Sequence, residues 1–430
     1  MRLIDILPAG SIACLLALSC GVLPVFADTL PVSAESLLAL SADSVPQAPA
    51  PAGGATDGAS KDTTSASSNV SAISGVKSGL ELVGSFDEMM PRGVAVSKDG
   101  RVFVCFPRYD QNGPYTVGVL KDGKCVAYPD AQTNQWDATN AGDRLVSVLG
   151  CQIDSKNRLW LLDSGRVGKD VVPGAVKLIA LDLQTGAIVK KWTFPPEVAL
   201  PTTVLKDLRI VSRIGKDGTA IIGDPAPLGK SGLIVIDLET GKSFRRLHGH
   251  PSVSAEPDFV IFAEGEMVRM RVSEDNKTDW TAGVAGLALS PDTSLLYYSP
   301  LAGLALSSIS VDALCNPAVS EAAVEKTIKS LDREVGTSDG LECDDKNRLY
   351  LTDVENNEIW RRDANGTMQK LVRDERLIWP DRLCLASDGY LYITVSQFHR
   401  GPWFHFGQDQ RQRPFHLYRI KVDDAPAQSR

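Results

Sequence analysis

Short apolar runs separated by polar turns fill the chain from about residue 80 onward. One clear case is an apolar run over 93–96, a polar turn at 97–100 and a second apolar run over 102–104. Runs of this length bounded by turn residues predict β-strands, and Asp-Gly or Asn in the turn favours the positive φ angles of a tight hairpin. The pattern therefore predicts a chain built from hairpins.

The strand–turn–strand pattern repeats along the chain. Six copies share it, with first strands beginning near residues 93, 150, 207, 286, 340 and 382. Further strands follow most copies, which gives units of four short strands. Radial blades repeat in this manner and a two-sheet sandwich does not. The sequence therefore predicts an all-β fold, a six-bladed β-propeller over residues 78–424.

The first residues have the pattern of an export signal. A short start carrying Arg2 leads into an apolar run at 12–18, and Ala27 ends a small-residue cleavage pattern. We therefore expect a signal peptide over 1–27 and a secreted or periplasmic protein. Lipid attachment at Cys20 is the alternative. Residues 28–77 are rich in Ala, Ser and Pro, which predicts a disordered linker.

Charge and hydropathy exclude several classes of partner. The net charge is −8 at a pI near 5.3, without the basic patch that nucleic acid requires. No stretch after the signal is apolar for long enough to span a bilayer.

Six cysteines follow the signal, and the spacing of Cys105 and Cys125 across one hairpin makes them the expected disulfide. The oligomeric state stays undetermined.

Several blocks of the sequence resemble the yellow / major royal jelly protein family. They are, in chain order, 107–114, 146–148, 158–165, 286–302 and 381–392. The resemblance implies a propeller with a small-molecule site in its central channel, for an aromatic amine or quinone-like ligand, and possible dopachrome-type isomerisation. Asn157 and residues 173–175 stand where insect members carry cysteines, which indicates a microbial relative with its own ligand preferences.

The start of each first strand is the place to look for chemistry, because this strand runs beside the axis of a propeller. Aligning the copies puts six residues at that place: Arg92, Leu149, Asp207, Ala285, Asp339 and Asp381. We predict that Arg92, Asp207, Asp339 and Asp381 bind the ligand. Three carboxylates held together raise their own pKa values unless a cation neutralises them.

Three interpretations of these carboxylates stay open. In the first, Asp339 and Asp381 pair with an organic amine, or Asp339 moves a proton during isomerisation. In the second, they bind Ca²⁺ in a gluconolactonase-like lactonase, although Arg92 and Ala285 leave that ligand set incomplete. In the third, Asp339 and Asp381 only cap backbone amides in tight loops. Independently of these three, the protein is either an enzyme or a non-catalytic protein that sequesters its ligand. The sequence assigns no metal site and no cofactor, and Ca²⁺ stays open only as the metal of the second interpretation.

The histidines add one further possibility. His399, His405 and His416 lie in an aromatic-rich segment near the C-terminus. The family resemblance places a loop of the final blade there, which would pack over the channel. A role for a histidine of this segment as a catalytic base stays open.

Overall fold

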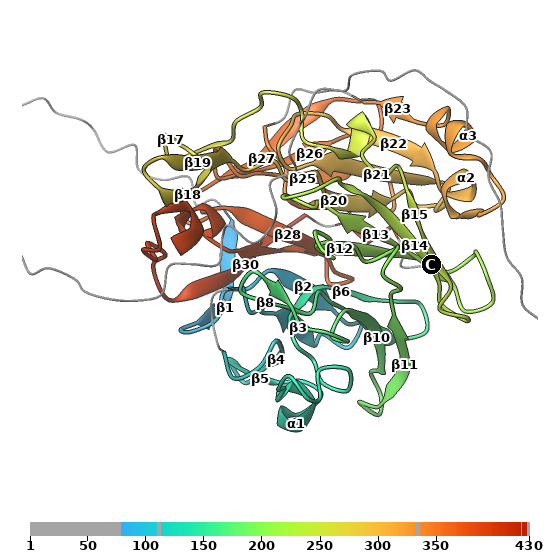
Figure 1. Ribbon diagram of the computed structural model, residues 1–430, viewed down its shortest axis with the longest axis horizontal. Coiled ribbons are helices and arrows are strands. Elements are labelled where there is room, and N and C mark those ends of the chain that lie inside the picture. The colour runs from blue at the N-terminus through green and yellow to red at the C-terminus, as the bar shows by residue number, and fades with distance from the viewer. Residues whose placement is uncertain (1–78, 110–112, 332–335, 423, 428–430) are drawn as a thin grey trace, which may run out of the picture. The chain divides into compact units, whose positions relative to one another are not determined.

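The computed structural model describes residues 79–109, 113–331, 336–422 and 424–427. The predicted signal peptide (1–27), the linker (28–77) and Cys20 lie outside the described residues. Within them, six four-stranded antiparallel sheets surround one axis (Figure 1), so the predicted all-β, six-bladed propeller is confirmed. In the described ranges, no helix has the length and apolar character needed to cross a bilayer.

Each blade runs from an inner strand to an outer strand, and the six inner strands contact one another in a closed ring. Blades 1 to 3 consist of β2 (Gly93–Val96), β3 (Val102–Cys105), β4 (Val117–Lys121) and β5 (Lys124–Ala127); β6 (Val148–Ile153), β7 (Arg158–Asp163), β10 (Lys177–Asp182) and β11 (Ile188–Thr193); and β12 (Asp207–Val211), β13 (Thr219–Asp224), β14 (Gly232–Asp237) and β15 (Ser243–Arg246). Blades 4 to 6 consist of β20 (Val284–Leu289), β21 (Leu295–Pro300), β22 (Ser307–Ser310) and β23 (Lys329–Ser330); β24 (Leu341–Cys343), β25 (Leu349–Asp353), β26 (Glu358–Arg362) and β27 (Met368–Arg373); and β28 (Pro380–Leu385), β29 (Tyr390–Val395), β30 (Phe415–Lys421) and β1 (Leu80–Phe86).

The ring closes through strands from opposite ends of the chain. β1 pairs antiparallel with β30, from Leu80 opposite Ile420 to Phe86 opposite Phe415, and the two lie side by side in Figure 1. Backbone hydrogen bonds between the first and last described strands therefore complete blade 6. Closing the sheets into a ring in this way removes the open edge that an incomplete circle of blades would leave.

The turn chemistry predicted from the sequence is confirmed. Gly100, Asn157 and Asn347 have φ angles of 84°, 58° and 60° in the hairpins that join the first two strands of blades 1, 2 and 5. These are the residue types that adopt positive φ at least cost. The turn residues in the sequence therefore correctly locate the first hairpin of each of these three blades.

The core is divided into wedges between neighbouring blades, which explains why the strands are apolar on both faces. Along β7, Leu159 and Leu161 pack toward blade 1, whereas Trp160 and Leu162 pack toward blade 3. Successive side chains of a strand point to opposite faces, so each middle strand serves two wedges. Similar clusters fill the spaces between the other blade pairs.

A glycine near the start of an inner strand allows the blades to approach one another around the axis. A Cβ atom at Gly93 would lie 2.7 Å from the Leu149 carbonyl oxygen, and one at Gly150 would lie 2.6 Å from the Lys206 carbonyl oxygen. Each neighbour is backbone of the next blade and cannot rotate away. The glycines that mark several of the repeats are therefore required by packing at the axis.

We expect Gly150→Ala to lower the free energy of unfolding by about 1–3 kcal/mol, as overpacking of a rigid site does. Gly142→Ala is the matched control, because the nearest atom to a Cβ there is 3.7 Å away. Urea unfolding of both variants measures the difference. Equal stability of the two variants would contradict this account of the repeat.

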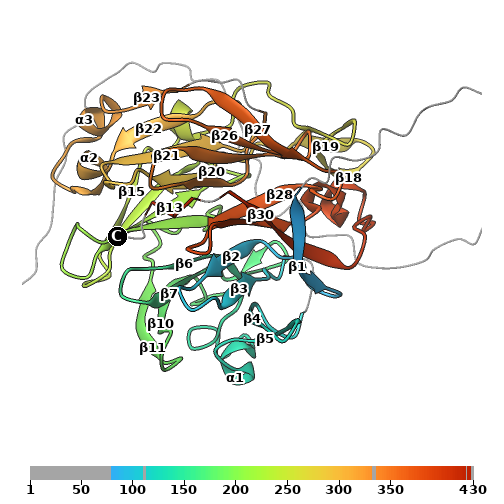
Figure 2. The same ribbon diagram turned by 180° about the vertical axis from the view of Figure 1, so that it is seen from behind.

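Two long connections lie over the starts of the inner strands. The one from β15 to β20 carries β16 (Phe262–Ala263), β17 (Glu266–Met267), β18 (Arg269–Ser273) and β19 (Asn276–Asp279); the one from β29 to β30 carries two 3-10 turns, η3 (Phe398–Arg400) and η4 (Pro402–Phe404). β18 contacts η4, and both views show them together (Figures 1 and 2). The smaller elements are β8 (Arg166–Val167), β9 (Asp170–Val171), α1 (Ala131–Asn134), α2 (Val311–Cys315), α3 (Glu321–Glu325) and η2 (Pro251–Val253).

The expected disulfide between Cys105 and Cys125 is wrong. Both thiols are free, as are those of the other described cysteines. Cys105 lies on β3 and Cys125 on β5, and β4 separates these strands: Val117 stands opposite Cys105 and Leu120 opposite Cys125. The interval from Cys105 to Cys125 therefore spans parts of three strands, and not the two strands of a single hairpin.

Candidate functional site

The six residues aligned from the sequence repeats lie around one small cavity on the axis. Lys206 and Arg382 complete its lining. The four residues predicted to bind ligand, Arg92, Asp207, Asp339 and Asp381, are at most 5% exposed. The cavity has room for about 10 Å³, which is about the space of one water molecule. As the structure stands, this space does not admit an organic ligand.

Cations of the chain itself neutralise two of the axial carboxylates. The Lys206 ammonium contacts Asp339 and lies 3.1 Å from an Asp381 oxygen. The Arg92 guanidinium contacts Asp381 and lies 3.5 Å from an Asp339 oxygen. Lys206 thus stands where the sequence interpretation expected the ammonium of a ligand.

The third carboxylate, Asp207, has a similar set of partners. Arg209 donates to it at 2.9 Å and Arg382 contacts its other oxygen. The backbone N–H groups of Leu208 and Leu287 also donate to Asp207, at 2.6 and 3.2 Å. We call the charged residues around the axis, which are buried or nearly so, the axial cluster: Arg92, Lys206, Asp207, Arg209, Asp339, Glu342, Asp381 and Arg382. Its four acidic and four basic side chains balance.

Burial and charge act in opposite directions on the titration of this cluster. Burial raises the pKa of the Asp381 carboxyl, and the Arg92 cation opposes that rise. Burial lowers the pKa of Arg92, but the Asp381 and Asp339 carboxylates outweigh it and raise that pKa above its usual value. The cation that three clustered carboxylates require is therefore supplied within the chain.

These residues do not fit a calcium ion. Ca²⁺ takes six to eight oxygen ligands, whereas the axial carboxylates already accept from Lys206, Arg92 and Arg382. Among the residues that the structure describes, no group of three or more His, Cys, Asp or Glu side chains is placed to hold a metal ion. We derive no chemical step through calcium.

A layer of aromatic rings covers the axial cluster. Trp379 donates from Nε1 to Asp339 at 2.9 Å, and Phe398 lies over the Arg92 guanidinium at 4.5 Å. We call Trp280, Trp379, Phe398 and Phe404, whose rings contact one another, the aromatic layer. Trp379 has a φ of 57°, a strained conformation for a bulky residue. In this conformation the Trp379 side chain contacts both layers of the site: Nε1 donates to Asp339, and the ring stacks on the His399 imidazole.

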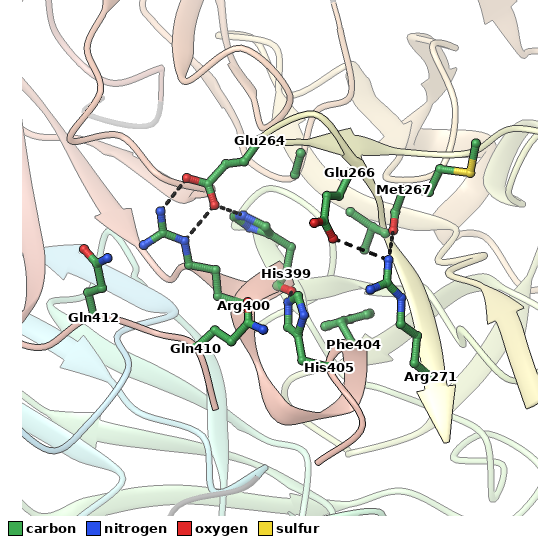
Figure 3. Close-up of a pocket in the computed structure, with 12 residues that line it drawn as sticks. Glu264, Glu266, Met267, Arg271, His399, Arg400, Phe404, His405, Gln410 and Gln412 are labelled. Atoms are coloured by element: carbon green, nitrogen blue, oxygen red, sulfur yellow. Dashed lines mark hydrogen bonds and ion pairs between the residues drawn. The ribbon is translucent and has the colours of Figure 1, made fainter. Parts of the chain in front are cut away.

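A larger pocket lies on the outer side of this layer. It has a volume of about 290 Å³, at the lower end of the range for small-molecule sites. We call it the mouth pocket, and its lining residues are Ala263, Glu264, Glu266, Met267, Val268, Arg271, His399, Arg400, Phe404, His405, Gln410 and Gln412 (Figure 3). Phe404 packs on Phe398 at 5.3 Å and the His399 ring stacks on Trp379 at 5.4 Å. One layer of rings therefore separates the pocket from the axis.

One wall of the mouth pocket is formed by side chains that hydrogen-bond across the two long connections. Glu264, between β16 and β17, accepts from His399 Nε2 and from Arg400 Nε, each at 2.7 Å (Figure 3). The hydrogen bonds from His399 and Arg400 lower the pKa of Glu264 to about 2. Glu264 therefore stays ionised at neutral pH and holds the imidazole and the guanidinium in place.

The opposite wall is held more loosely. The Arg271 guanidinium lies 3.5 Å from a Glu266 oxygen and 3.5 Å from the Met267 carbonyl oxygen. His405 points into the pocket between this side and His399 (Figure 3). Burial lowers the pKa of His405. This wall thus offers charged and polar groups whose contacts within the chain are long or few.

The sequence repeats predicted the axial positions, and the structure places further charged residues at the axis and in the mouth pocket. Lys206 and Arg382 directly flank Asp207 and Asp381 in the sequence, so a search for nearby cations would have found them. Glu264 and Arg271 lie in a connection between repeats, where the alignment of blades gave no signal. Ligand binding by the four axial residues and proton transfer by Asp339 stay predictions, and both would require the aromatic layer to move.

The comparison with known families decides the identity of the chain. The model of the major royal jelly protein family matches residues 146–430. This chain belongs to the major royal jelly protein family. The match includes most of the blocks that carried the resemblance, all of blades 2 to 5 and three of the four strands of blade 6.

Individual relatives of this family member are distant. Major royal jelly proteins 7 and 1 of Apis mellifera are each 30% identical, over 215 and 226 residues, which cover 47% and 49% of this chain and 44% and 48% of theirs. Protein yellow of Drosophila pseudoobscura pseudoobscura is 28% identical, over 47% of this chain and 36% of its own. The chain spans less than half the length of these relatives. It is also similar to the structure of a gluconolactonase from Xanthomonas campestris, with a TM-score of 0.48, 13% identity and coverage of 80% of this chain and 89% of that one.

Proposed function

We propose that this propeller is exported and that it binds and isomerises a small aromatic molecule, amine-bearing or quinone-like, in the mouth pocket. Export rests on the sequence pattern of residues 1–27. The ligand class rests on the family, and the location rests on one observation. The axial cavity is filled by ion pairs, whereas the mouth pocket is open and lined by polar groups.

The lining of the mouth pocket supports this class of ligand. Phe404 supplies an aromatic face for a ring. Glu266, Arg271 and the amides of Gln410 and Gln412 supply partners for an ammonium group or for ring oxygens. Two histidines and two carboxylates line the same space, and side chains of these types accept and donate protons in general acid–base catalysis. The proposal thus moves proton transfer from the buried Asp339 to the pocket above it.

The test is a calorimetric titration of residues 28–430 with dopamine, serotonin and Ca²⁺. We expect micromolar binding of at least one amine. Gln410→Trp places an indole in the pocket and should weaken that binding at least 30-fold, because Gln410 is exposed and lines the cavity. The control is Gln408→Trp, an exposed neighbour outside the lining, which should bind as the parent does. Equal binding by both variants, or no amine binding by the parent, would refute the proposal.

A further inference from the structure

One imidazole in the mouth pocket has its tautomer fixed by the backbone. His405 Nε2 lies 3.0 Å from the carbonyl oxygen of His399. A carbonyl oxygen accepts hydrogen bonds and does not donate them, so Nε2 carries the proton. Nδ1 of the neutral ring is then an acceptor with a lone pair. His405 lines the pocket and is partly exposed, so a ligand in the pocket lies beside this ring.

The surroundings of His405 favour the neutral ring. Burial is the main cause that lowers the pKa of His405, and the electrostatic effects of Arg271 and His399 act in the same direction. The hydrogen bond to the His399 carbonyl and the Glu266 carboxylate oppose them. The net direction is downward, which favours the neutral ring, with Nδ1 as its acceptor, at neutral pH.

A cation with spare hydrogen-bonding capacity lies on the same side of the pocket. Arg271 carries five N–H donors, and its contacts at 3.5 Å to Glu266 and Met267 are long for charge-assisted hydrogen bonds. Its side chain is 23% exposed. By contrast, Arg400 is already bound to Glu264 through two of its nitrogens. Arg271 is thus the guanidinium of the lining that is available to an oxygen of a ligand.

We propose that His405 is the catalytic base of this pocket and that Arg271 binds the oxygen on which negative charge develops. The inference rests on the proposed function. His405 Nδ1 takes a proton from a ring carbon of the quinone-like substrate, and the C–H electron pair moves through the conjugated ring to the carbonyl oxygen. Arg271 stabilises that oxyanion until it gains a proton. A C–H bond is lost and an O–H bond is formed, so the step needs no oxidant or reductant.

His399 has a different part in this arrangement. Its Nε2 is bound to Glu264 and its carbonyl oxygen accepts from His405. His399 is therefore a positioning residue, which fixes the tautomer of His405 through its backbone. Glu264 and the Trp379 ring hold His399 itself in place.

The test measures turnover of freshly prepared dopachrome by His405→Gln. Glutamine keeps an N–H donor for the His399 carbonyl but has no basic nitrogen. We expect kcat to fall about 100-fold or more, the range for loss of a general base, with dopamine binding within twofold of the parent. Turnover by the parent should rise with pH, with a midpoint below the ordinary histidine value of about 6.5. That rise should be absent from the residual activity of the variant.

Two further variants separate catalysis from structure. His405→Ala should regain activity when imidazole is added, which a structural role would not explain. His416→Gln removes a histidine on β30 outside the pocket lining and should leave turnover unchanged. Full activity of His405→Gln, or dopamine binding by the parent without dopachrome turnover, would overturn the inference and leave the binding proposal standing. Absence of binding by the parent would instead refute the proposed function.

Discussion

Lys206→Met should lower the free energy of unfolding by about 3–5 kcal/mol, the usual cost of removing one partner from a buried ion pair. The ammonium of Lys206 bridges Asp339 and Asp381, which are 1% and 2% exposed. Without it, two buried carboxylates face each other with Arg92 as their remaining cation. Their repulsion and incomplete solvation both act against the folded state.

Urea unfolding at neutral pH measures this effect. Lys216→Met is the control, because Lys216 pairs with Glu239 on the surface and is 82% exposed, where an ion pair contributes at most about 1 kcal/mol. Adding Asp339→Asn to Lys206→Met should restore part of the loss, since one of the two facing charges is then removed. If Lys206→Met is as stable as Lys216→Met, the axial cluster is not held together by its charges.

Lys177→Met should have an effect of similar size, about 3–5 kcal/mol, at a different place. Lys177 and Asp163 are fully buried and lie 2.9 Å apart. Lys177 also donates to the carbonyl oxygens of Ala141 and Ala175, at 2.9 and 2.8 Å. Methionine would leave all three acceptors without this donor and Asp163 without its cation.

Asp163 explains why the loss would spread through blade 2. Its carboxylate accepts from the backbone N–H groups of Val146, Ser147 and Gly165, at 2.8, 2.8 and 3.0 Å. Two of the sequence blocks that carry the family resemblance are thus joined by the hydrogen bonds of one buried side chain. Lys191→Met, which removes an exposed partner of Asp143, is the control and should cost less than about 1 kcal/mol. A loss no larger for Lys177→Met than for this control would contradict the assignment.

Much of the fold was predictable because each blade repeats a local signal. The turns at Gly100, Asn157 and Asn347 require positive φ, so the residue type marks the hairpin directly. The axial positions followed from counting back from those turns, and the cavity lining contains all six of them. Local chemistry and a fixed strand spacing were sufficient for these features.

The site was harder to predict because its parts come from irregular connections. Glu264 and His399 are far apart in the sequence and meet through tertiary packing. Such contacts leave no periodic pattern. The balance of charges at the axis could not be predicted from one aligned position in each blade. Lys206 and Arg382 lie one residue away from the aligned positions Asp207 and Asp381, yet both line the cavity. Adjacent residues of neighbouring strands share the crowded space at the axis.

A crystal structure of the protein soaked with dopamine tests the central claim most directly, that the mouth pocket and not the axis is the ligand site. The account predicts the ring of the ligand against Phe404, within hydrogen-bonding distance of His405 or Arg271, with the ion pairs of Lys206 intact. A ligand found between Asp339 and Asp381, with Lys206 displaced and the aromatic layer opened, would contradict it. In that case the axial carboxylates would be the binding site that the sequence alone predicts.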